Sequence, residues 1–219
     1  MQTSGTSASG QTGASVKQFS APGPERPAAL GCVIMASGLG RRFGGNKLMA
    51  ELGGKPLICW VLEATEGIFS HRVVVTRHPD VEALCRRRQT PVVFHDLPYR
   101  SDTVRLGLEA LGENLSGCMF CPGDQPLLSR ESVQTMALRA AQERSFIWRL
   151  AYGDVAGTPV LFPRWAFPQL RALPQGKGGS VILQKNPGQV RLVPAREECE
   201  LWDVDSPDDL KLVSSCLER

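Results

Sequence analysis

The sequence predicts an α/β protein with three layers, in which helices cover both faces of a mostly parallel sheet. Two observations lead to this prediction. Apolar runs of strand length alternate along the chain with segments of helical periodicity. Such alternation is typical of parallel sheets, because consecutive parallel strands need a crossover connection, usually a helix. The second observation is a glycine-rich turn placed directly after the first apolar run, as in many ligand-binding α/β folds.

The elements of the first half follow in order from these patterns. Runs rich in Val, Ile and Cys predict strands, and apolar residues spaced three or four apart predict helices. In chain order we expect a strand at Leu30–Ala36, a helix at 56–69, strands at 72–76 and 90–95, a helix at 102–111, a strand at 117–121, and a helix at 129–143 capped by Ser129.

The second half is less regular. We expect strands at 146–152 and 159–162, a short helix at 165–173, a strand at 190–193 and a closing helix at 208–217. Ser206 and Pro207 suit the cap and first position of that last helix, and Asp208 and Asp209 suit its positive end.

The chain is expected to form one domain, residues 29–219, preceded by a tail. Residues 1–28 contain mostly Ser, Gly, Thr, Gln, Ala and Pro, so they cannot bury enough apolar surface to fold, and we interpret them as a disordered tail or a tag. They lack the apolar centre of a secretory signal, and no run in the sequence is long enough to cross a membrane. A single domain without a membrane segment is the expectation.

Composition excludes several classes of partner. The formal net charge of +3 is too small to indicate nucleic-acid binding, and Arg86-Arg87-Arg88 ends a helical pattern, where basic residues suit the helix dipole. Seven cysteines without an export signal predict reduced thiols in the cytoplasm. Cys118 and Cys121 have the spacing of a metal-binding pair, but residues three apart on a strand point to opposite faces. We therefore expect these two to be packing cysteines.

The glycine-rich turn is the first candidate site. Residues 35–47 contain four glycines, two arginines and Lys47, directly after an apolar strand. Glycines let backbone N–H groups approach an anion, and Arg42 and Lys47 supply charge for phosphate oxygens. We interpret the segment as a solvated loop that cradles a triphosphate.

Two better-known phosphate loops do not fit this segment. A P-loop requires Lys and then Ser or Thr after its last glycine, whereas Asn46 and Leu48 flank Lys47 here. The dinucleotide-binding fingerprint would place its third glycine at Phe43, and no acidic residue ends the next strand. An ordinary glycine turn is the remaining alternative, and the clustered cations argue against it.

A second constellation lies at the end of the fourth apolar strand. Asp124, in Gly-Asp-Gln-Pro, is expected at the same edge of the sheet as the glycine loop, where its carboxylate could hold Mg²⁺ on substrate phosphates. Asp in a turn is the alternative. Asp203 and Asp205 alternate on an extended segment, so they share one face. Either a second metal contact or a ribose contact would be possible for these two residues, and the sequence does not choose between them.

These segments together resemble the nucleotidyltransferases that add CMP or GMP to the molybdenum pterin cofactor. The family's opening motif is matched by glycines, the arginine and the lysine, with Met35 and Ser37 departing from it. Gly-Asp-Gln-Pro-Leu at 123–127 resembles the form of the cytidylyltransferase branch. The matching residues of the opening motif are Ala36, Gly38, Gly40, Arg42, Gly44 and Lys47.

Two later segments are similar to the same branch. Gly-Thr-Pro-Val-Leu-Phe at 157–162 resembles its acceptor-side segment, and Trp-Asp-Val-Asp-Ser-Pro at 202–207 resembles its closing motif. The branch has an acidic residue in Gly-Asp-Lys-Gly, and this chain has Gln-Gly-Lys-Gly-Gly at 175–179 instead. The resemblance implies the Rossmann-like nucleotidyltransferase fold.

The resemblance also implies roles for individual residues. Arg42, Lys47 and Asp124 would be catalytic, and Asp124 with Asp205 would hold Mg²⁺. The nucleotide would be bound by Ala36, Ser37, Gly38, Leu39, Gly40, Arg42, Lys47, Ser101, Thr103 and Asp124, and the acceptor by Gly157, Pro159, Lys177 and Gly178.

The implied reaction is the transfer of CMP from CTP to the phosphate of the molybdenum pterin cofactor, with release of pyrophosphate, for a molybdenum hydroxylase. Neither a nucleic acid nor a membrane is an expected partner. Two alternatives remain open. One is another transferase of the same fold, acting with GTP on the cofactor or on a sugar or polyol phosphate. The other is a non-catalytic carrier of the pterin cofactor.

Overall fold

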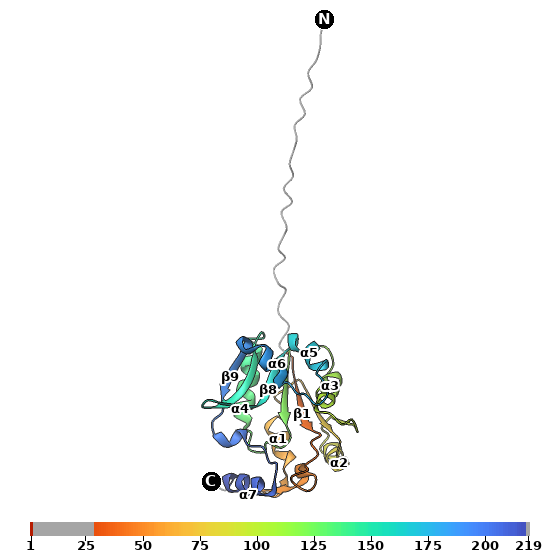
Figure 1. Cartoon of the computed structure of the whole chain (residues 1–219), viewed down its shortest axis with the longest axis vertical. Coiled ribbons are helices and arrows are strands. Elements are labelled where there is room, and N and C mark those ends of the chain that lie inside the picture. Colours follow the sequence, from red (N-terminus) through yellow and green to blue (C-terminus); the bar gives the residue numbers. More distant parts are fainter. Residues whose placement is uncertain (2–28, 218–219) are drawn as a thin grey trace.

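The computed structural model describes Met1 and residues 29–217. The predicted tail therefore lies, apart from Met1, outside the described residues. Residues 29–217 form a seven-stranded sheet with helices on both sides (Figure 1). This arrangement confirms the three-layer α/β prediction.

The sheet is parallel in its first half and mixed in its second. β1 (Leu30–Ala36) is an interior strand and pairs in parallel with β4 and β6, and β4 pairs in parallel with β5. β8 runs antiparallel to both β6 and β7, and β9 is parallel to β7. The strand order is β5-β4-β1-β6-β8-β7-β9. The other strands are β4 (His71–Thr76), β5 (Val92–Phe94), β6 (Gly117–Pro122), β7 (Ile147–Tyr152), β8 (Val155–Pro163) and β9 (Val190–Pro194).

Helices fill both faces because successive strand residues point to opposite sides. Cys32 and Ile34 of β1 pack in one core, whereas Val33 packs in the other. The first core contains residues of α1 (Ile58–Ala64), α2 (Pro79–Arg87), α4 (Arg130–Gln142) and α7 (Pro207–Leu217). The second contains residues of α3 (Arg100–Leu111), α5 (Phe167–Arg171) and α6 (Ser180–Lys185).

The cysteines behave as packing residues. Cys121 lies in the first core and Cys118 in the second, so the two thiols diverge as expected from the strand period. Burial raises the pKa of the Cys118 thiol well above its ordinary value. None of the seven cysteines, all of which lie in the described residues, forms a disulfide.

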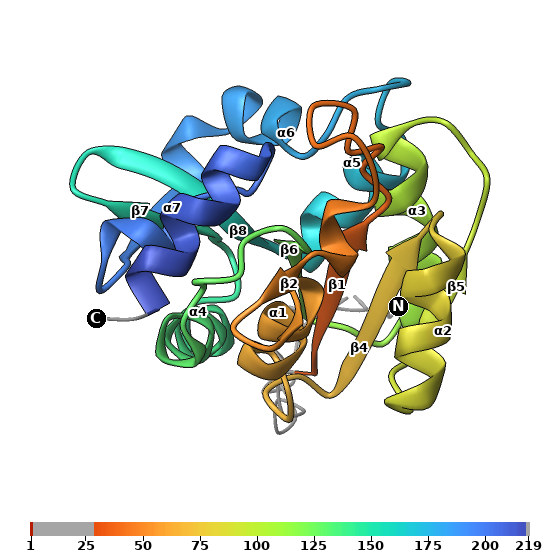
Figure 2. The same ribbon diagram turned by 90° about the horizontal axis from the view of Figure 1, so that it is seen from below.

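Several boundaries differ from the sequence-based expectation. A hairpin of β2 (Glu51–Leu52) and β3 (Lys55–Pro56) precedes α1, which is shorter than the predicted helix at 56–69. Gly53 and Gly54 have φ values of 58° and 80°, and this left-handed turn makes the hairpin possible. Figure 2 shows β2 beside β1 and α1.

Short 3₁₀ helices lie between the other elements. They are η1 (Lys47–Met49), η2 (Arg164–Ala166), η3 (Pro187–Gln189) and η4 (Glu198–Leu201). At the start of α7, Ser206 Oγ accepts from the Asp209 N–H at 3.3 Å, so the predicted cap is confirmed.

The basic cluster at the end of α2 is a helix terminus. Arg86 and Arg87 lie in the last turn of α2 and Arg88 caps it, as the dipole argument predicts; Arg86 also pairs with Glu82 at 2.6 Å and Arg88 with Glu63 at 3.0 Å. Within residues 29–217, no helix has the length and apolar character needed to cross a membrane.

Candidate active site

A cleft of about 660 Å³ opens at the carboxyl edge of the parallel strands. Its wall includes residues that follow β1 and β6, the start of α3, and residues of β7 and β8. In Figure 2 the loop after β1 and the segment before α6 lie at the same side of the molecule, and both contribute to the lining. Segments far apart in sequence therefore meet at the edge where open α/β sheets bind ligands.

The glycine loop turns sharply at Gly40. This residue has a φ of 58°, and a Cβ atom there would lie 2.1 Å from the carbonyl oxygen of Gly45. Its own carbonyl accepts from the N–H groups of Phe43 at 3.0 Å and Gly44 at 3.1 Å. Only glycine fits this tight, left-handed turn.

The start of α2 holds the loop at both ends. His78 Nε2 lies 2.7 Å from the Gly38 carbonyl oxygen, and Asn46 Nδ2 donates to Asp80 Oδ1 at 2.7 Å. Asn46 Oδ1 also accepts from the Leu48 N–H at 3.2 Å and so caps η1, which begins at Lys47. These contacts fix where the loop presents its lysine.

Lys47 lies between two carboxylates. Its Nζ is 2.7 Å from Asp124 Oδ2 and 2.6 Å from Asp205 Oδ1, and its side chain is only 8% exposed. Arg42 also pairs with Asp205, but its side chain remains 76% exposed. The expectation of a solvated loop is therefore correct for Arg42 and wrong for Lys47, because the carboxylates draw the lysine into the cleft.

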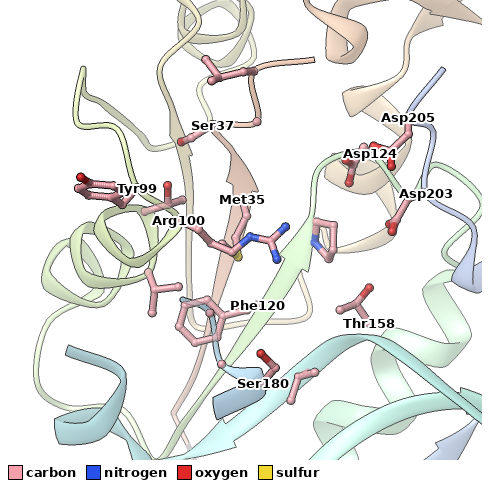
Figure 3. A pocket seen from close by; sticks show the side chains of 18 of the residues that line it. Met35, Ser37, Tyr99, Arg100, Phe120, Asp124, Thr158, Ser180, Asp203 and Asp205 are labelled. Atoms are coloured by element: carbon pink, nitrogen blue, oxygen red, sulfur yellow. The ribbon is translucent and has the colours of Figure 1, made fainter. Parts of the chain in front are cut away.

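Backbone contacts explain why the carboxylates converge. The Gly123 N–H donates to the Met35 carbonyl at 3.0 Å, which continues the pairing of β6 with β1 up to Asp124. The Val204 N–H donates to the Asp124 carbonyl at 2.9 Å, and the Val204 side chain is buried in the core. Asp203 and Asp205 on either side of Val204 therefore both line the cleft (Figure 3).

Charges in this cluster perturb one another. Burial alone would lower the pKa of Lys47, but Asp124 and Asp205 outweigh it and raise the pKa above its ordinary value. The hydrogen bond from Lys47 lowers the pKa of Asp205. Partial loss of hydration, together with the negative Asp124 and Asp205, raises the pKa of Asp203 to about 6, although the residue remains exposed at the rim of the cleft.

The donor set fits a hard divalent cation. Oxygens of Asp124 and Asp205 already converge on one positive nitrogen, which marks the place where positive charge is favoured. Within residues 29–217, no group of three His, Cys, Asp or Glu side chains is arranged to hold a metal ion. An ion bound here would need further ligands from a substrate, which is how Mg²⁺ is usually held with phosphates.

Most of the predicted site residues line this one cleft. They are Ser37, Gly38, Leu39, Gly40, Arg42, Lys47, Thr103, Asp124, Gly157, Gly178 and Asp205. Four others do not contribute to the lining: Ala36 and Ser101 are buried beneath it, Pro159 lies within β8, and Lys177 is exposed outside it. The roles assigned to all these residues by resemblance stay predictions.

Several lining residues were not named individually among the predicted site residues. Arg100, Arg149, Thr158 and Ser180 come from α3, β7, β8 and α6. Of these four residues, only Arg149 could have been noticed in the sequence. It interrupts an otherwise apolar strand pattern, Ile-Trp-Arg-Leu, at 147–150. Figure 3 shows Arg100 reaching into the cleft, opposite the three carboxylates.

A buried polar bridge supports the first residue of the loop. Ser37 Oγ donates to the Val75 carbonyl at 3.1 Å and lies 2.8 Å from His95 Nε2. Burial and the nearby Arg77 lower the pKa of His95, so its imidazole is neutral at pH 7. This bridge ties β1, β4 and the end of β5 together beneath the loop.

Comparison with known proteins gives a family match. Residues 32–190 match the model of the MobA-like NTP transferase domain. A probable molybdenum cofactor guanylyltransferase from Pyrococcus furiosus is 25% identical over 198 residues, which is 85% of this chain and 97% of the relative. The match therefore extends over nearly the whole length of that relative.

Other similarities are shorter or purely structural. The bifunctional protein GlmU of Kineococcus radiotolerans is 37% identical over 123 residues, but this chain matches only 52% of its own length and 25% of that protein. The crystal structure of Rv0371c from Mycobacterium tuberculosis superposes with a TM-score of 0.76 at 22% identity and covers 86% of this chain and 98% of that one. This last similarity confirms the fold.

Proposed function

The chain belongs to the MobA-like NTP transferase domain family, and from that premise we propose that it transfers CMP from CTP to the phosphate of the molybdenum pterin cofactor. The family is catalytic, so the carrier hypothesis is set aside in favour of an enzyme. The observation that carries the proposal is the convergence of Lys47, Asp124 and Asp205 beneath a glycine-rich loop. This combination of groups suits a triphosphate and its metal ion, because carboxylates hold Mg²⁺ and a lysine neutralises phosphate oxygens.

The loop would bind the triphosphate. Gly38, Leu39 and Gly40 line the cleft, where their backbone N–H groups would be available to phosphate oxygens, and the Arg42 side chain is exposed in the same lining. Such groups neutralise the negative charge that builds on pyrophosphate as it leaves. His78 and Asn46 would keep the loop in place by their contacts with Gly38 and Asp80.

Asp124 and Asp205 would hold Mg²⁺. When bound, the ion supplies charge neutralisation for the attacking and leaving oxygens. Lys47 now occupies the space between the two carboxylates. It would exchange its carboxylate partners for phosphate oxygens once a metal–nucleotide complex enters.

The chemistry then needs no general base. An oxygen of the acceptor phosphate, already ionised at pH 7, forms a bond to the α-phosphorus, and the bond between that phosphorus and the bridging oxygen to the β-phosphate breaks. The electron pair leaves with pyrophosphate. The protein contributes orientation and charge neutralisation, which together account for much of the rate in such transfers.

The choice of CTP rests on Gly-Asp-Gln-Pro-Leu at 123–127 and its resemblance to the cytidylyl branch. The long match to a probable guanylyltransferase favours the same acceptor with GTP as the second candidate. We place the protein in the cytoplasm, where its unpaired cysteines would stay reduced, and infer that the product serves a molybdenum hydroxylase.

Pyrophosphate release with each nucleotide tests this proposal. Purified protein is incubated with Mg²⁺ and either the molybdenum pterin cofactor or a sugar phosphate, and CTP, GTP, ATP and UTP are compared. We expect cofactor-dependent release with CTP that exceeds release with the others by at least tenfold. Preference for GTP would show that GTP, and not CTP, is the nucleotide substrate. Pyrophosphate release that depends on a sugar phosphate instead of the cofactor would refute the cofactor as the acceptor.

A further inference from the structure

Arg149 is a half-buried arginine that faces the cleft from β7. Its Nε donates to the Gly157 carbonyl at 2.7 Å, and its Nη2 donates to the Ala156 carbonyl at 2.6 Å. Both acceptors belong to β8, next to a shift in register between β7 and β8. The guanidinium is therefore held in one orientation, and its Nη1 makes no hydrogen bond within the described residues.

This cation has no counter-charge. Over residues 29–217, Arg149 forms no ion pair, whereas Lys47 and Arg42 in the same cleft are paired with carboxylates. Burial lowers the pKa of Arg149, although an arginine stays charged at any ordinary pH. A partly buried charge without a partner is unfavourable, so the site is suited to an anion supplied by a ligand.

Neighbouring groups are also donors. Arg100 lines the same cleft and forms no ion pair in the described part of the chain, and the hydroxyls of Thr158 and Ser180 have no hydrogen-bond partner there. Figure 3 shows Arg100 and Ser180 in the part of the cleft away from Asp205, and Thr158 between Ser180 and Asp203. Arg100, Thr158 and Ser180 therefore add donors to the cleft beside Arg149, and within residues 29–217 neither arginine is paired with a carboxylate.

Gly178 makes room for Arg100. A Cβ atom at Gly178 would lie 3.1 Å from Arg100 Cδ, so the glycine lets the arginine side chain lie against the backbone. At Gly179 a Cβ atom would lie 2.6 Å from the Phe162 ring. Packing thus explains Gly178 and Gly179, Gly176 has a left-handed φ of 73°, and Lys177 itself is exposed outside the lining.

We propose that Arg149, supported by Arg100, binds a phosphomonoester group, the attacking phosphate of the acceptor. This inference rests on the proposed function for the identity of the acceptor. The triphosphate is assigned to Arg42 and Lys47 at the other side of the cleft, which leaves the second pair of cations for the second anion. Two phosphates repel each other, and fixed guanidinium groups reduce that repulsion while orienting the nucleophile.

Two substitutions at Arg149 separate charge from structure. Arg149→Gln keeps an amide donor for the β8 carbonyls but removes the charge, and Arg149→Lys keeps the charge but removes the forked geometry. Arg191→Gln is the matched control, because Arg191 also donates to backbone carbonyls, those of Gly188 and Val190, and lies outside the cleft.

The apparent KM values for cofactor and for CTP are measured separately, together with Tm. We expect Arg149→Gln to raise the cofactor KM at least tenfold and to leave the CTP KM within twofold, with Arg149→Lys intermediate and Arg191→Gln unchanged. If only the CTP KM rises in Arg149→Gln, Arg149 binds the nucleotide and not the acceptor. If both KM values are unchanged and Tm is lower, Arg149 only holds β7 and β8 together. Either result overturns the proposal.

A binding measurement keeps this test independent of the reaction. Inorganic phosphate is titrated calorimetrically into protein saturated with a CTP analogue that carries a methylene group between the α- and β-phosphorus atoms. Wild-type protein should bind phosphate, and Arg149→Gln should bind it at least tenfold more weakly. Equal binding by both would contradict the anion site, even if the molybdenum cofactor proved not to be the acceptor.

Discussion

At the scale of single residues, Lys47 combines two roles. In the substrate-free protein it neutralises Asp124 and Asp205, and during transfer it would neutralise phosphate. The sequence placed Lys47 in a phosphate loop, because glycines and cations cluster there. It could not reveal the ion pair, because Asp205 lies 158 residues further along the chain and comes near only through the sheet.

Replacing Lys47 by Met tests this double role. Without the ammonium group the two carboxylates repel each other, and we expect the free energy of unfolding to fall by about 2 kcal/mol. This is less than for a fully buried pair, because the Asp205 side chain is 37% exposed. In EDTA the Tm should fall by about 4–8 °C. In the absence of nucleotide, the affinity for Mn²⁺ should rise, because the metal no longer competes with Nζ.

Calorimetric titration with Mn²⁺ and thermal melts provide the readout for this variant. Arg42→Met is the control, since the Arg42 side chain is 76% exposed and its loss should change Tm by less than about 2 °C. Mn²⁺ affinity that is unchanged or weaker in Lys47→Met would contradict the shared position of lysine and metal.

Asp203 should make stability depend on pH. Its pKa is about 6 in the folded protein, above the ordinary carboxyl value, so the folded state binds the proton more tightly than the unfolded state does. The protein therefore loses stability as the pH rises from about 4 to about 6, and this loss persists at higher pH. Solvent contact at Asp203 limits the effect to roughly 1 kcal/mol or less.

Asp203→Asn removes that titration. In EDTA at pH 7.5, we expect the Tm of Asp203→Asn to exceed that of the wild type by up to about 4 °C. The difference should shrink toward pH 4. Melting curves across this range measure it. A variant that is less stable than wild type at pH 7.5, or a difference that grows toward pH 4, would show that Asp203 is not held in an unfavourable ionised state.

At the scale of elements, the glycine loop was predictable in place but not in shape. Its position after β1 followed from the apolar run, and its composition indicated anion binding. Which glycine is indispensable depends on the approach of Gly45 to Gly40, a contact that spacing alone does not encode. The β2–β3 hairpin was missed for a related reason, since its strands of two residues are too short to show periodicity.

Gly40→Ala should disable the loop. A Cβ atom would meet the Gly45 carbonyl at 2.1 Å in a left-handed conformation, so the loop must rearrange. We expect the KM for CTP to rise at least tenfold while far-UV circular dichroism stays native. Gly45→Ala is the control, because a Cβ atom there meets nothing within 4 Å and its φ lies outside the left-handed range. Equal KM values for the two variants would contradict the assigned turn.

At the scale of the whole molecule, alternation of apolar runs with helical segments was enough to predict the three-layer fold. Two residues predicted for the acceptor, Gly157 and Gly178, do line the cleft, but the arginines beside them were not predicted. Arg149 lies on a strand whose partner β8 runs antiparallel, and Arg100 begins a helix that the pattern placed two residues later. Arg149 stands out in the sequence because it interrupts an apolar strand pattern, but only tertiary packing places Arg149 and Arg100 in the cleft, so local sequence could not assign them to it. The acidic segment at 203–205 was predicted as a site candidate because its alternation already placed two carboxylates on one face.

The most direct test of the central claim follows the fate of each phosphorus atom of CTP. The protein is incubated with Mg²⁺ and the molybdenum pterin cofactor, with CTP labelled with ³²P in either the α- or the γ-position, and the products are separated by chromatography. Attack on the α-phosphorus predicts that α-label appears in the cofactor and γ-label appears only in pyrophosphate, in equal amounts. Appearance of γ-label in the cofactor, or of α-label only in free CMP, would contradict nucleotidyl transfer to this acceptor.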